Sequence, residues 1–473
     1  MADLGREPAL GGDRPLVVVG AGPVGSLLAL VLARRGHRVA LYERQDDLRR
    51  GFRDRGRSIN IALSERGLHL LRELGLTGSV LQDAMPMRGR MVHPESGPRF
   101  PLLYGRSEAD VTFSLRRTDL NLNLLVAAEA TGRVSLHFRH ALQRYDFASE
   151  LAVFRDEATG DEVQVEAPII FGADGSASAL RTSILEATGG EVRLEPLATA
   201  YKELIIPSAA GAHAFEPDSL HIWPRRTFLL IAMPNSDGSF TATLCVDLEA
   251  RPGHPSFAGL SSEAALTAFF ERHFPDVVPH VPDLAAKLIR IPTGRLANTL
   301  VSPWCHERAL LIGDSAHALV PFLGQGLNAG FEDCTGLARI LDTEASSRHP
   351  DWRAMFETFS VRRKPDTDAL ADMSVENHRE MRERVADPRF VLEKEVEARL
   401  SRRYPGEYVS RYQLITFTRV PYRVAQHAGR IQEAILGEVC AGADGPGDVD
   451  YERARALVKE RLRPMLAEYG LLQ

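Results

Sequence analysis

Residues 16–43 read LVVVGAGPVGSLLALVLARRGHRVALYE, and this stretch decides the fold of the N-terminal part of the chain. A short apolar run stops at Gly20, and a segment rich in Leu and Ala, Ser26 to Arg35, has the composition of a helix. A second apolar run, Arg38 to Tyr42, ends at the acidic residue Glu43. The order strand, helix, strand in so short a stretch predicts a parallel βαβ unit.

Three glycines shape the turn between the first strand and the helix. Gly20 permits a tight turn, Gly22 lets a pyrophosphate approach the backbone, and Gly25 lets helix and strand pack closely. Unpaired N–H groups at the helix N-terminus then face the phosphates. A merely tight turn would not need the acid Glu43, whose carboxylate can bind ribose hydroxyls. The residues predicted to bind a dinucleotide here are Gly20, Gly22, Val24, Gly25, Glu43 and Arg44.

Composition excludes several classes of protein. The chain has 473 residues, 44% of them hydrophobic and 25% charged, which predicts two or three folded units. A formal net charge of −6 gives no reason to expect nucleic acid or an anionic membrane as a partner. No run of about 18 apolar residues occurs, so we expect no membrane anchor. Residues 1–14 look like a short disordered lead-in and not a signal peptide, which predicts a cytoplasmic protein.

Cysteine usage argues against a metal site. The four cysteines form no Cys-x-x-Cys pair, and none lies near a His at zinc-ligand spacing. We therefore expect structural thiols in a reducing compartment and no bound metal. The cysteines are Cys245, Cys305, Cys334 and Cys440.

Two later segments distinguish between dinucleotides. Residues 172–181 read GADGSASALR, and residues 311–317 read LIGDSAH and are followed by Gly324-Gln325-Gly326. These segments resemble the Asp-Gly and Gly-Asp motifs of the para-hydroxybenzoate-hydroxylase class of flavin monooxygenases. The resemblance implies FAD, with Asp174 and Asp314 among its ligands; the second motif's aspartate binds the ribityl chain in that class. The Gly-rich helix start would face the flavin pyrimidine, where N–H groups stabilise negative charge.

Within that class the chain resembles the kynurenine 3-monooxygenase family from about residue 15 to 430. The matching segments are GRSINIALS (56–64), PMRGRMVH (86–93), LHIWPR (220–225), PFLGQGLNAGFEDC (321–334) and TFTR (416–419). The resemblance implies that four residues hold the amino-acid carboxylate of L-kynurenine, namely Arg90, Tyr104, Asn377 and Tyr412. A planar guanidinium suits a carboxylate because it can bind both oxygens.

The same resemblance implies further FAD contacts from Ala62, Arg117, Leu142 and the backbone of Leu327 and Asn328. Arg116 is a neighbouring candidate that sequence alone does not separate from Arg117.

Two positions depart from the family pattern. Leu323 stands where the family carries an aromatic residue or His, and Cys245 stands where an aromatic residue is usual. We therefore expect a less aromatic pocket there, which leaves the preferred ring substitution open. A local repacking without functional effect is the alternative. A cluster of arginines is a candidate for docking the NADPH phosphates, but a solvated basic loop is the better interpretation, and we assign no NADPH residue. Its members are Arg44, Arg49, Arg50, Arg53, Arg55 and Arg57.

The expected chemistry is that of the class. NADPH, or NADH, would reduce the flavin, O₂ would form a peroxide at its C4a carbon, and the aromatic ring would attack the distal oxygen. We assign no acid or base catalyst, and we interpret His93 and His317 as structural or flavin-neighbour residues.

Four functions remain open from the sequence. They are 3-hydroxylation of L-kynurenine, the same chemistry on a ring-substituted kynurenine or another aromatic amino acid, flavin-dependent halogenation, and a non-catalytic flavoprotein. Halogenases of this kind need a Trp-x-Trp pair, whereas Trp223, Trp304 and Trp352 are far apart.

The predicted fold class is α/β: a Rossmann-like FAD-binding domain of the para-hydroxybenzoate-hydroxylase type, with an antiparallel substrate sheet and C-terminal helices. We expect the FAD domain over 15–85, 112–190 and 296–345, the substrate sheet over 86–111 and 191–295, closing helices over 346–440 and an amphipathic helix over 450–473. A helix is expected from residue 59 to 74, and a small meander is expected from strands near residues 137, 151 and 163. The sequence does not fix the oligomeric state.

Overall fold

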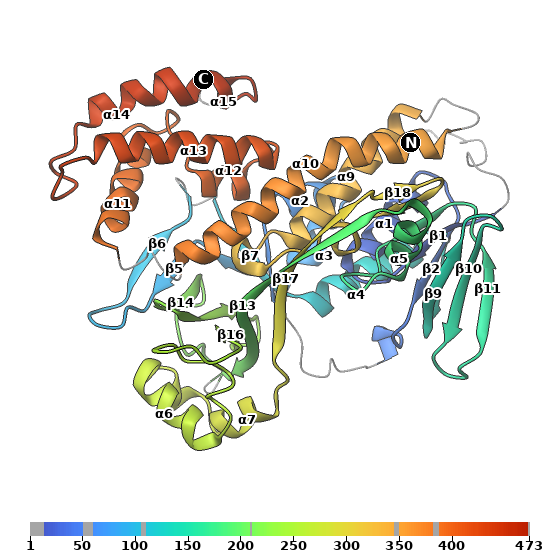
Figure 1. Cartoon of the computed structure of the whole chain (residues 1–473), viewed down its shortest axis with the longest axis horizontal. Helices are drawn as coiled ribbons and strands as arrows, with labels where there is room; N and C mark the ends of the chain where they lie inside the picture. The colour runs from blue at the N-terminus through green and yellow to red at the C-terminus, as the bar shows by residue number, and fades with distance from the viewer. Residues whose placement is uncertain are drawn as a thin grey trace.

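The computed structural model describes residues 14–50, 60–105, 110–208, 211–344, 350–381 and 387–471 (Figure 1). Three of the clustered arginines (Arg53, Arg55 and Arg57), the first part of the 56–64 segment and the N-terminal lead-in lie outside the described residues.

A six-stranded sheet forms the core of the nucleotide-binding part, in the order β18-β19-β12-β1-β2-β8. All neighbours pair in parallel except β18 with β19. Parallel strands are covered on both faces, which explains why they read as continuous apolar runs. The strands are β1 (Leu16–Val19), β2 (Val39–Glu43), β8 (Val134–Phe138), β12 (Ile170–Gly172), β18 (Cys305–His306) and β19 (Ala309–Leu311).

Helix α1 (Pro23–Arg34) is almost wholly buried because it packs between α4 (Arg117–Glu129) and α9 (Gly326–Glu344). A three-stranded antiparallel meander lies beside this sheet at the edge of the molecule (Figure 1), made of β9 (His140–Asp146), β10 (Leu151–Asp156) and β11 (Glu162–Glu166), and α5 (Ala179–Thr188) packs on β9. The expectation that the strand near residue 137 joins the meander is wrong, since β8 pairs in parallel with β2.

A seven-stranded sheet forms the second unit, in the order β17-β13-β16-β15-β14-β5-β6, and only β14 and β5 pair in parallel. The alternation of strands gives it two apolar faces. One face carries Trp223, Phe228 and Leu244 against α6 (Glu263–His273) and α7 (Leu284–Arg290). The strands are β5 (Gly89–Val92), β6 (Phe100–Leu103), β13 (Glu191–Ile206), β14 (Ser219–Arg225), β15 (Phe228–Pro234), β16 (Phe240–Asp247) and β17 (Gly294–Ser302).

The opposite face of this sheet presents the neighbouring residues of the same strands, including Val92, Ile222 and Cys245. They pack against Phe322, in the short 3₁₀ turn Pro321–Leu323, and against Met381 just beyond α10. Because the β-strand period is two, the sheet separates a core face from a face turned toward the rest of the protein.

A small sheet links the two units, made of β3 (Asn60–Leu63), β7 (Thr112–Arg116) and β4 (Met85–Met87). The single helix expected over residues 59–74 is therefore wrong: β3 precedes α2 (Glu65–Glu73), and α3 (Thr77–Leu81) is separate. The Asn60 carboxamide hydrogen-bonds to Ser114 and Asn235, so tertiary contacts override the local helical pattern.

The helices that follow α10 gather at one end of the molecule, close to β5 and β6, whereas α10 runs from that end across the molecule to β18 and β19 (Figure 1). Within the described residues, no helix has the length and apolar character needed to cross a bilayer. The expected terminal helix is interrupted by a π-helical turn, although its apolar residues are buried as expected. The helices are α10 (Trp352–Arg379), α11 (Pro388–Arg403), α12 (Arg411–Phe417), α13 (Tyr422–Val439), α14 (Tyr451–Leu457), the π turn (Val458–Leu462) and α15 (Arg463–Ala467).

The core face of the seven-stranded sheet contains a chain of buried polar groups. His221 Nε2 donates to the Glu216 carbonyl at 2.9 Å, and His221 Nδ1 lies 2.9 Å from His93 Nε2. His93 Nδ1 in turn lies 2.8 Å from a carboxylate oxygen of Asp276. His221 is fully buried, and this burial lowers its pKa to about 4, so the folded protein holds it neutral.

We expect acid to destabilise the protein through His221. The folded-state pKa of His221 is lowered, so its contribution to stability is present above about pH 6.5 and is lost as the pH falls toward about 4. The loss should be on the order of 3 kcal/mol in the free energy of unfolding. Denaturant unfolding at several pH values measures it, and His221→Gln, which cannot be protonated, should flatten the dependence. Equal pH profiles for both proteins would contradict the prediction.

Candidate functional site

The glycine turn has the shape that the sequence predicts. Gly20 has φ +98°, and a Cβ there would overlap the Ala173 carbonyl group of the neighbouring strand connection. A Cβ on Gly25 would overlap the Gly20 carbonyl oxygen. Gly22 is the N-cap of α1, and no side chain caps this helix. The first N–H groups of α1 are therefore left for a ligand, which fits a pyrophosphate.

Glu43 holds the same turn from the end of β2. Its carboxylate accepts hydrogen bonds from the backbone N–H of Ala21 at 2.8 Å and of Gln45 at 2.9 Å. The Ala21 carbonyl accepts a bond from Asn121 Nδ2 at 2.8 Å. Arg44 is exposed beside this turn. The carboxylate is thus fixed next to the turn, at the edge where a ribose would lie.

Val24 closes the other side of α1. Its side chain fills the space above Gly313 and Gly330, where an added Cβ on Gly330 would come within 2.6 Å of Val24 Cγ2. Val24 therefore joins α1 to the Gly-Asp turn and to α9 through packing and needs no polar contact.

The Asp-Gly and Gly-Asp motifs meet through side chains. Asp174 accepts hydrogen bonds from the Ala179 N–H at 2.8 Å and from Ser315 Oγ at 3.0 Å, and Ser315 Oγ accepts from the Gly175 N–H at 2.9 Å. Asp174 thus joins the start of α5 to the start of α8 (Asp314–His317). In contrast, the Asp314 side chain is exposed at the first position of α8, which leaves its carboxylate available to a ligand.

Asn328 connects α9 to β3. Its Oδ1 accepts from the Ser64 N–H at 2.9 Å, and its Nδ2 donates to the Ala62 carbonyl at 2.9 Å. Ala62 Cβ also lies beside the turn at Gly324, 3.5 Å from where a Cβ would stand. Leu327 is partly buried in the first turn of α9. Ala62, Leu327 and Asn328 therefore come together, as the sequence predicts.

The structure separates the two neighbouring arginines. Arg116 forms an ion pair with Asp237. Arg117 is exposed, and its guanidinium lies 3.7 Å from the place of a Cβ on Gly22, directly beside the glycine turn. Leu142 lies on β9 and is 8% exposed within the apolar core, opposite Phe154.

Three residues of the expected carboxylate set form a compact cluster. The rings of Tyr104 and Tyr412 stack with their centres 5.1 Å apart, and the Arg90 guanidinium lies 5.7 Å from one ring centre and 5.2 Å from the other. Burial and the adjacent Tyr412 raise the pKa of Tyr104, which keeps its phenol protonated. Although burial opposes it, the neighbours Tyr104, Tyr412 and Glu380 raise the pKa of Arg90. The cluster is a guanidinium beside two phenol hydroxyl groups, which suits a carboxylate.

Asn377 lies on α10 at the edge of the apolar cluster that contains Val92, Phe322 and Met381. Its Nδ2 donates to the Phe322 carbonyl at 2.8 Å and contacts Met381 Sδ at 3.4 Å. Since Val92 follows Arg90 by two residues on β5, both point from the same face of the sheet. The Asn377 amide thus faces the same region as the cluster of Arg90, Tyr104 and Tyr412, but its hydrogen bonds go to Phe322 and Met381.

The two departures from the family pattern lie in different surroundings. Cys245 is buried in the apolar cluster with Phe322 on the face shared by Val92. Leu323 packs against the C-terminal helices instead. Of the two departures, Cys245 therefore changes the apolar wall next to the cluster of Arg90, Tyr104 and Tyr412.

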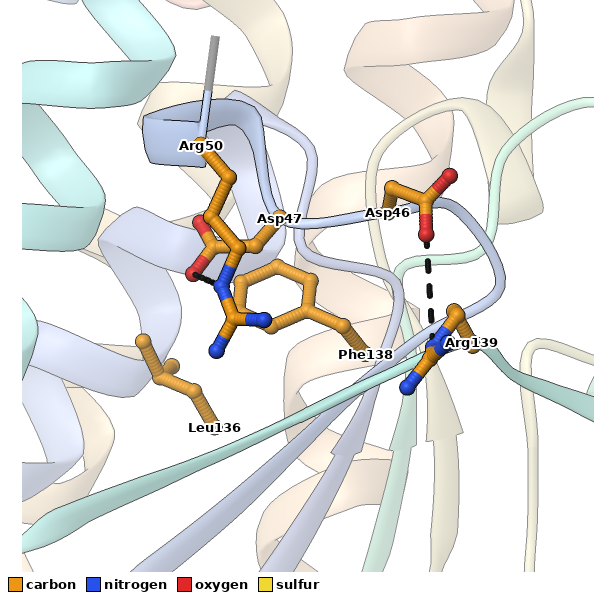
Figure 2. A pocket seen from close by; sticks show the side chains of 6 residues that line it. All are labelled: Asp46, Asp47, Arg50, Leu136, Phe138 and Arg139. Atoms are coloured by element: carbon orange, nitrogen blue, oxygen red, sulfur yellow. Dashed lines mark ion pairs between the residues drawn. The ribbon is translucent and has the colours of Figure 1, made fainter. Parts of the chain in front are cut away.

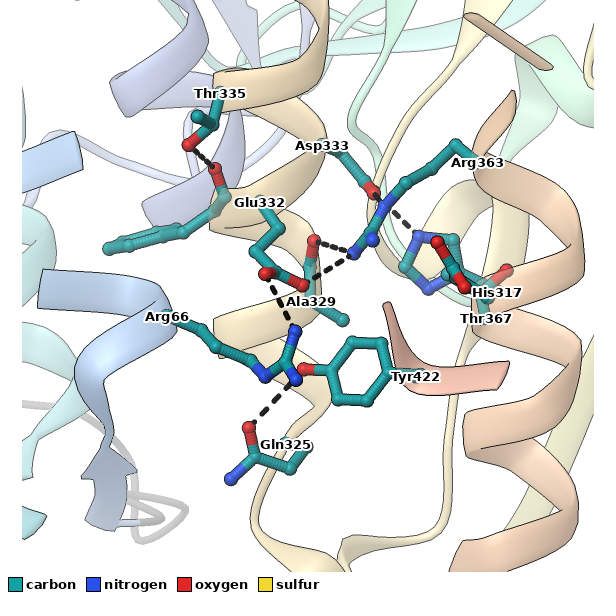
Figure 3. A network of polar contacts seen from close by, with 12 residues as sticks. Arg66, His317, Gln325, Ala329, Glu332, Asp333, Thr335, Arg363, Thr367 and Tyr422 are labelled. Atoms are coloured by element: carbon teal, nitrogen blue, oxygen red, sulfur yellow. Dashed lines mark hydrogen bonds and ion pairs between the residues drawn. The ribbon is translucent and has the colours of Figure 1, made fainter. Parts of the chain in front are cut away.

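A buried polar network runs behind the Gly-Asp turn (Figure 3). Asp333 accepts from the Gly313 N–H at 3.0 Å, from His317 Nε2 at 2.6 Å and from Arg363 Nε at 2.6 Å. Although burial opposes it, His317 and Arg363 lower the pKa of Asp333 to about 2. His317 is 1% exposed and engaged in this network, as its structural interpretation predicts.

Sequence reasoning missed two residues of this region. Gln413 donates from Nε2 to the Tyr104 carbonyl at 3.4 Å, and Arg66 is a fully buried arginine that contacts the end of α12. The Ser410-x-x-Gln413 capping box is visible in the sequence and could have marked the start of α12. No local signal distinguishes Arg66 from a surface arginine.

A cavity of about 370 Å³ lies between the end of β2 and β8 (Figure 2). Arg50 lies 4.0 Å from Asp47, and Arg139 lies 4.0 Å from Asp46, so acids already pair with the arginines that line it. This arrangement does not single out a residue for NADPH.

Comparison with known proteins gives consistent results. Residues 13–374 match the family model described as FAD binding domain. Kynurenine 3-monooxygenase of Myxococcus xanthus (strain DK1622) is 45% identical over 457 residues, which are 96% of this chain and 97% of that protein. Kynurenine 3-monooxygenase of Stenotrophomonas maltophilia (strain K279a) is 41% identical over 95% of this chain and 97% of that protein.

Solved structures share the fold. The tetrameric form of 2-methyl-3-hydroxypyridine-5-carboxylic acid oxygenase matches with a TM-score of 0.63 and 23% identity, covering 81% of this chain and 96% of that chain. PqsL of Pseudomonas aeruginosa, described as a probable FAD-dependent monooxygenase, matches with a TM-score of 0.60 and 17% identity over 78% of this chain and 97% of that chain. The predicted fold class, an FAD-binding α/β domain with a substrate sheet and C-terminal helices, is confirmed.

We expect Arg117→Ala to weaken FAD binding and Arg116→Ala to leave it unchanged. Arg117 lies beside the glycine turn, where its charge would reach a bound pyrophosphate, whereas Arg116 is paired with Asp237. Loss of one charge-assisted contact should raise the Kd for FAD about tenfold. Fluorescence titration of the apoprotein with FAD measures this Kd. The assignment fails if the two variants bind FAD equally well.

Proposed function

Because the chain belongs to the kynurenine 3-monooxygenase family, we propose that it hydroxylates L-kynurenine at ring position 3, with FAD as cofactor, NADPH as electron donor and O₂ as oxygen source. The observation that carries the choice of substrate is the cluster of Arg90, Tyr104 and Tyr412. An amino-acid carboxylate would place a negative charge directly beside this half-buried guanidinium.

The carboxylate would bind between the guanidinium and the two phenols. Arg90 can donate two parallel N–H groups to its oxygens, and the hydroxyl groups of Tyr104 and Tyr412 can donate as well. Asn377 would complete the set from α10 once its amide turns toward the substrate.

The aromatic ring would then lie along the apolar wall of Val92, Cys245 and Phe322. This wall excludes water from the ring, which favours transfer of oxygen to substrate over loss of peroxide. The apolar character of the wall supports an aromatic ring, and not a charged group, at this end of the substrate.

When bound, FAD supplies the redox chemistry: it takes electrons from NADPH and activates O₂ for transfer of one oxygen atom. The protein has to hold the cofactor, for which we propose Gly20, Gly22, Val24, Gly25, Glu43, Arg44, Ala62, Arg117, Leu142, Asp174, Asp314, Leu327 and Asn328. We propose that the two sheets divide the work, the parallel sheet holding FAD and the seven-stranded sheet holding the substrate.

The substrate needs little acid or base help from the protein. An aniline nitrogen donates electron density to the ring carbon beside it, which is ring position 3 of kynurenine. The two candidate histidines are buried in structural networks: His93 with Asp276 and His221, and His317 with Asp333. This supports a site that positions its substrate and does not transfer protons through a dyad.

We expect the FAD-loaded protein to consume NADPH and O₂ faster when L-kynurenine is added, and to form 3-hydroxykynurenine. Product mass and NADPH absorbance measure this, with an equal concentration of benzoate as the ligand control. NADPH oxidation that yields only hydrogen peroxide would contradict the proposal. The presence of Cys245 in the apolar wall favours a second candidate, a ring-substituted kynurenine, which a higher kcat/KM for that compound would establish.

Arg90→Met should reduce kcat/KM for L-kynurenine roughly 100-fold, because it leaves the substrate carboxylate without its cation at a cost on the order of 3 kcal/mol. The effect should lie mainly in KM. Arg99→Met is the matched control. Arg99 lies on the same β5–β6 hairpin as Arg90, but it forms an exposed ion pair with Glu216. A KM for Arg90→Met within twofold of that of Arg99→Met would remove Arg90 from the site.

A further inference from the structure

We propose that Arg66 is a positioning residue for the reaction: it fixes the helix that carries Tyr412 against β3, which carries Ala62, and against α9, which carries Asn328. The inference rests on the proposed function, because it concerns how the substrate end and the flavin end of one site are kept in register. Arg66 itself touches neither end.

Arg66 forms hydrogen bonds with the C-terminal end of α12. Its guanidinium is 1% exposed, and its Nε donates to the Ile415 carbonyl at 2.6 Å. One terminal nitrogen donates to the carbonyls of Leu414 at 3.2 Å and Val420 at 2.6 Å. The last carbonyls of a helix have no partner within the helix, so Arg66 caps α12 and the loop that follows it.

This cap matters because α12 is a helix of only seven residues, Arg411–Phe417. Such a short helix has little stability of its own and takes its position from outside contacts. At its other end, the capping box of Ser410 and Gln413 starts the helix, and Gln413 Nε2 donates to the Tyr104 carbonyl. Tyr412 lies directly before Gln413 and two residues before Leu414, whose carbonyl Arg66 binds, so both attachments bear on its position.

The other side of the Arg66 guanidinium reaches α9 (Figure 3). One terminal nitrogen donates to Glu332 at 2.8 Å, and Glu332 also accepts from Arg363 at 3.2 Å. The Tyr422 ring stacks on Arg66 with 3.9 Å between the guanidinium carbon and the ring centre, and its hydroxyl donates to Gln325 at 3.3 Å. Gln325 belongs to the glycine turn that starts α9.

The backbone of Arg66 is held to the flavin side. The Ser64 N–H donates to Asn328 Oδ1, and that carboxamide also binds the Ala62 carbonyl. Gly67, next to Arg66, permits this approach, since a Cβ there would come within 2.6 Å of Asn328 Oδ1. A change in the position of α12 therefore acts directly on the segment expected to line the flavin.

A lysine at this position provides the decisive variant. Arg66→Lys keeps the buried positive charge beside Glu332 but cannot bind three carbonyls with a planar fork. Arg389→Lys is the matched control, because Arg389 binds the carbonyls of Gly437 and Cys440 at the end of α13, a helix that carries no residue of the proposed site.

We expect Arg66→Lys to raise KM for L-kynurenine about tenfold and to increase the hydrogen peroxide formed per NADPH. FAD content and NADPH oxidation without substrate should match the wild type. The Kd for kynurenine, read from the flavin absorbance change, should weaken to the same extent. Arg389→Lys should change none of these quantities.

An unchanged KM and coupling in Arg66→Lys would overturn the inference, as would an equal change in Arg389→Lys. If Arg66→Lys does not fold, Thr418→Val decides the question, because the Thr418 hydroxyl is the other side-chain donor to the Leu414 carbonyl. A KM about threefold higher in that variant supports the inference, and an unchanged KM overturns it. The proposed function fails if the wild type does not hydroxylate kynurenine. The inference about Arg66 alone fails if the wild type hydroxylates kynurenine and the variants match it. The two failures are therefore distinguishable.

Discussion

Glu332 and Asp333 are adjacent on α9, and both carboxylates are removed from water, with side-chain exposures of 10% and 0%. Buried carboxylates need counter-charges, and these come from other elements: Arg66 from α2, and Arg363 from α10. Asp333 also accepts the Gly313 N–H, which orients the turn before Asp314. Removing one partner of such a network leaves a charge unpaired in the interior. The network therefore holds α2, α9, α10 and the turn at Gly313 in one arrangement.

That arrangement explains how a site can be built from distant segments without an acid–base dyad. The buried network fixes α9, and α9 fixes β3 through Asn328 and α12 through Arg66. The cation that we propose for the substrate is Arg90, which lies beside the rings of Tyr104 and Tyr412. The protein therefore contributes charge and position, while the electron and oxygen chemistry belongs to FAD.

The sequence predicts what local geometry decides. The turn at Gly20, Gly22 and Gly25 is a local requirement, since each glycine avoids an overlap or leaves an N–H open, and the fold class follows from it. The sequence fails where distant contacts decide: β3 reads as the start of a helix because its partner β7 lies about 50 residues away. Tyr104 and Gln413 are 309 residues apart, so only the family resemblance could bring their regions together. The residues next to Arg66 in the sequence do not predict that its side chain is buried.

Side chains alternate between the two faces of the seven-stranded sheet, and this alternation separates the core from the proposed substrate site. Each of its central strands sends one residue to the core face and the next to the face of the carboxylate cluster: Trp223 and Leu244 to the first, Ile222 and Cys245 to the second. The two faces can therefore vary independently, since a change at Cys245 alters the wall beside the ring but leaves the packing under α6 intact. Under the proposed function, the preference for a substituent on the substrate ring is thereby separated from binding of the carboxylate, which we propose depends on Arg90 and on the helix that Arg66 holds.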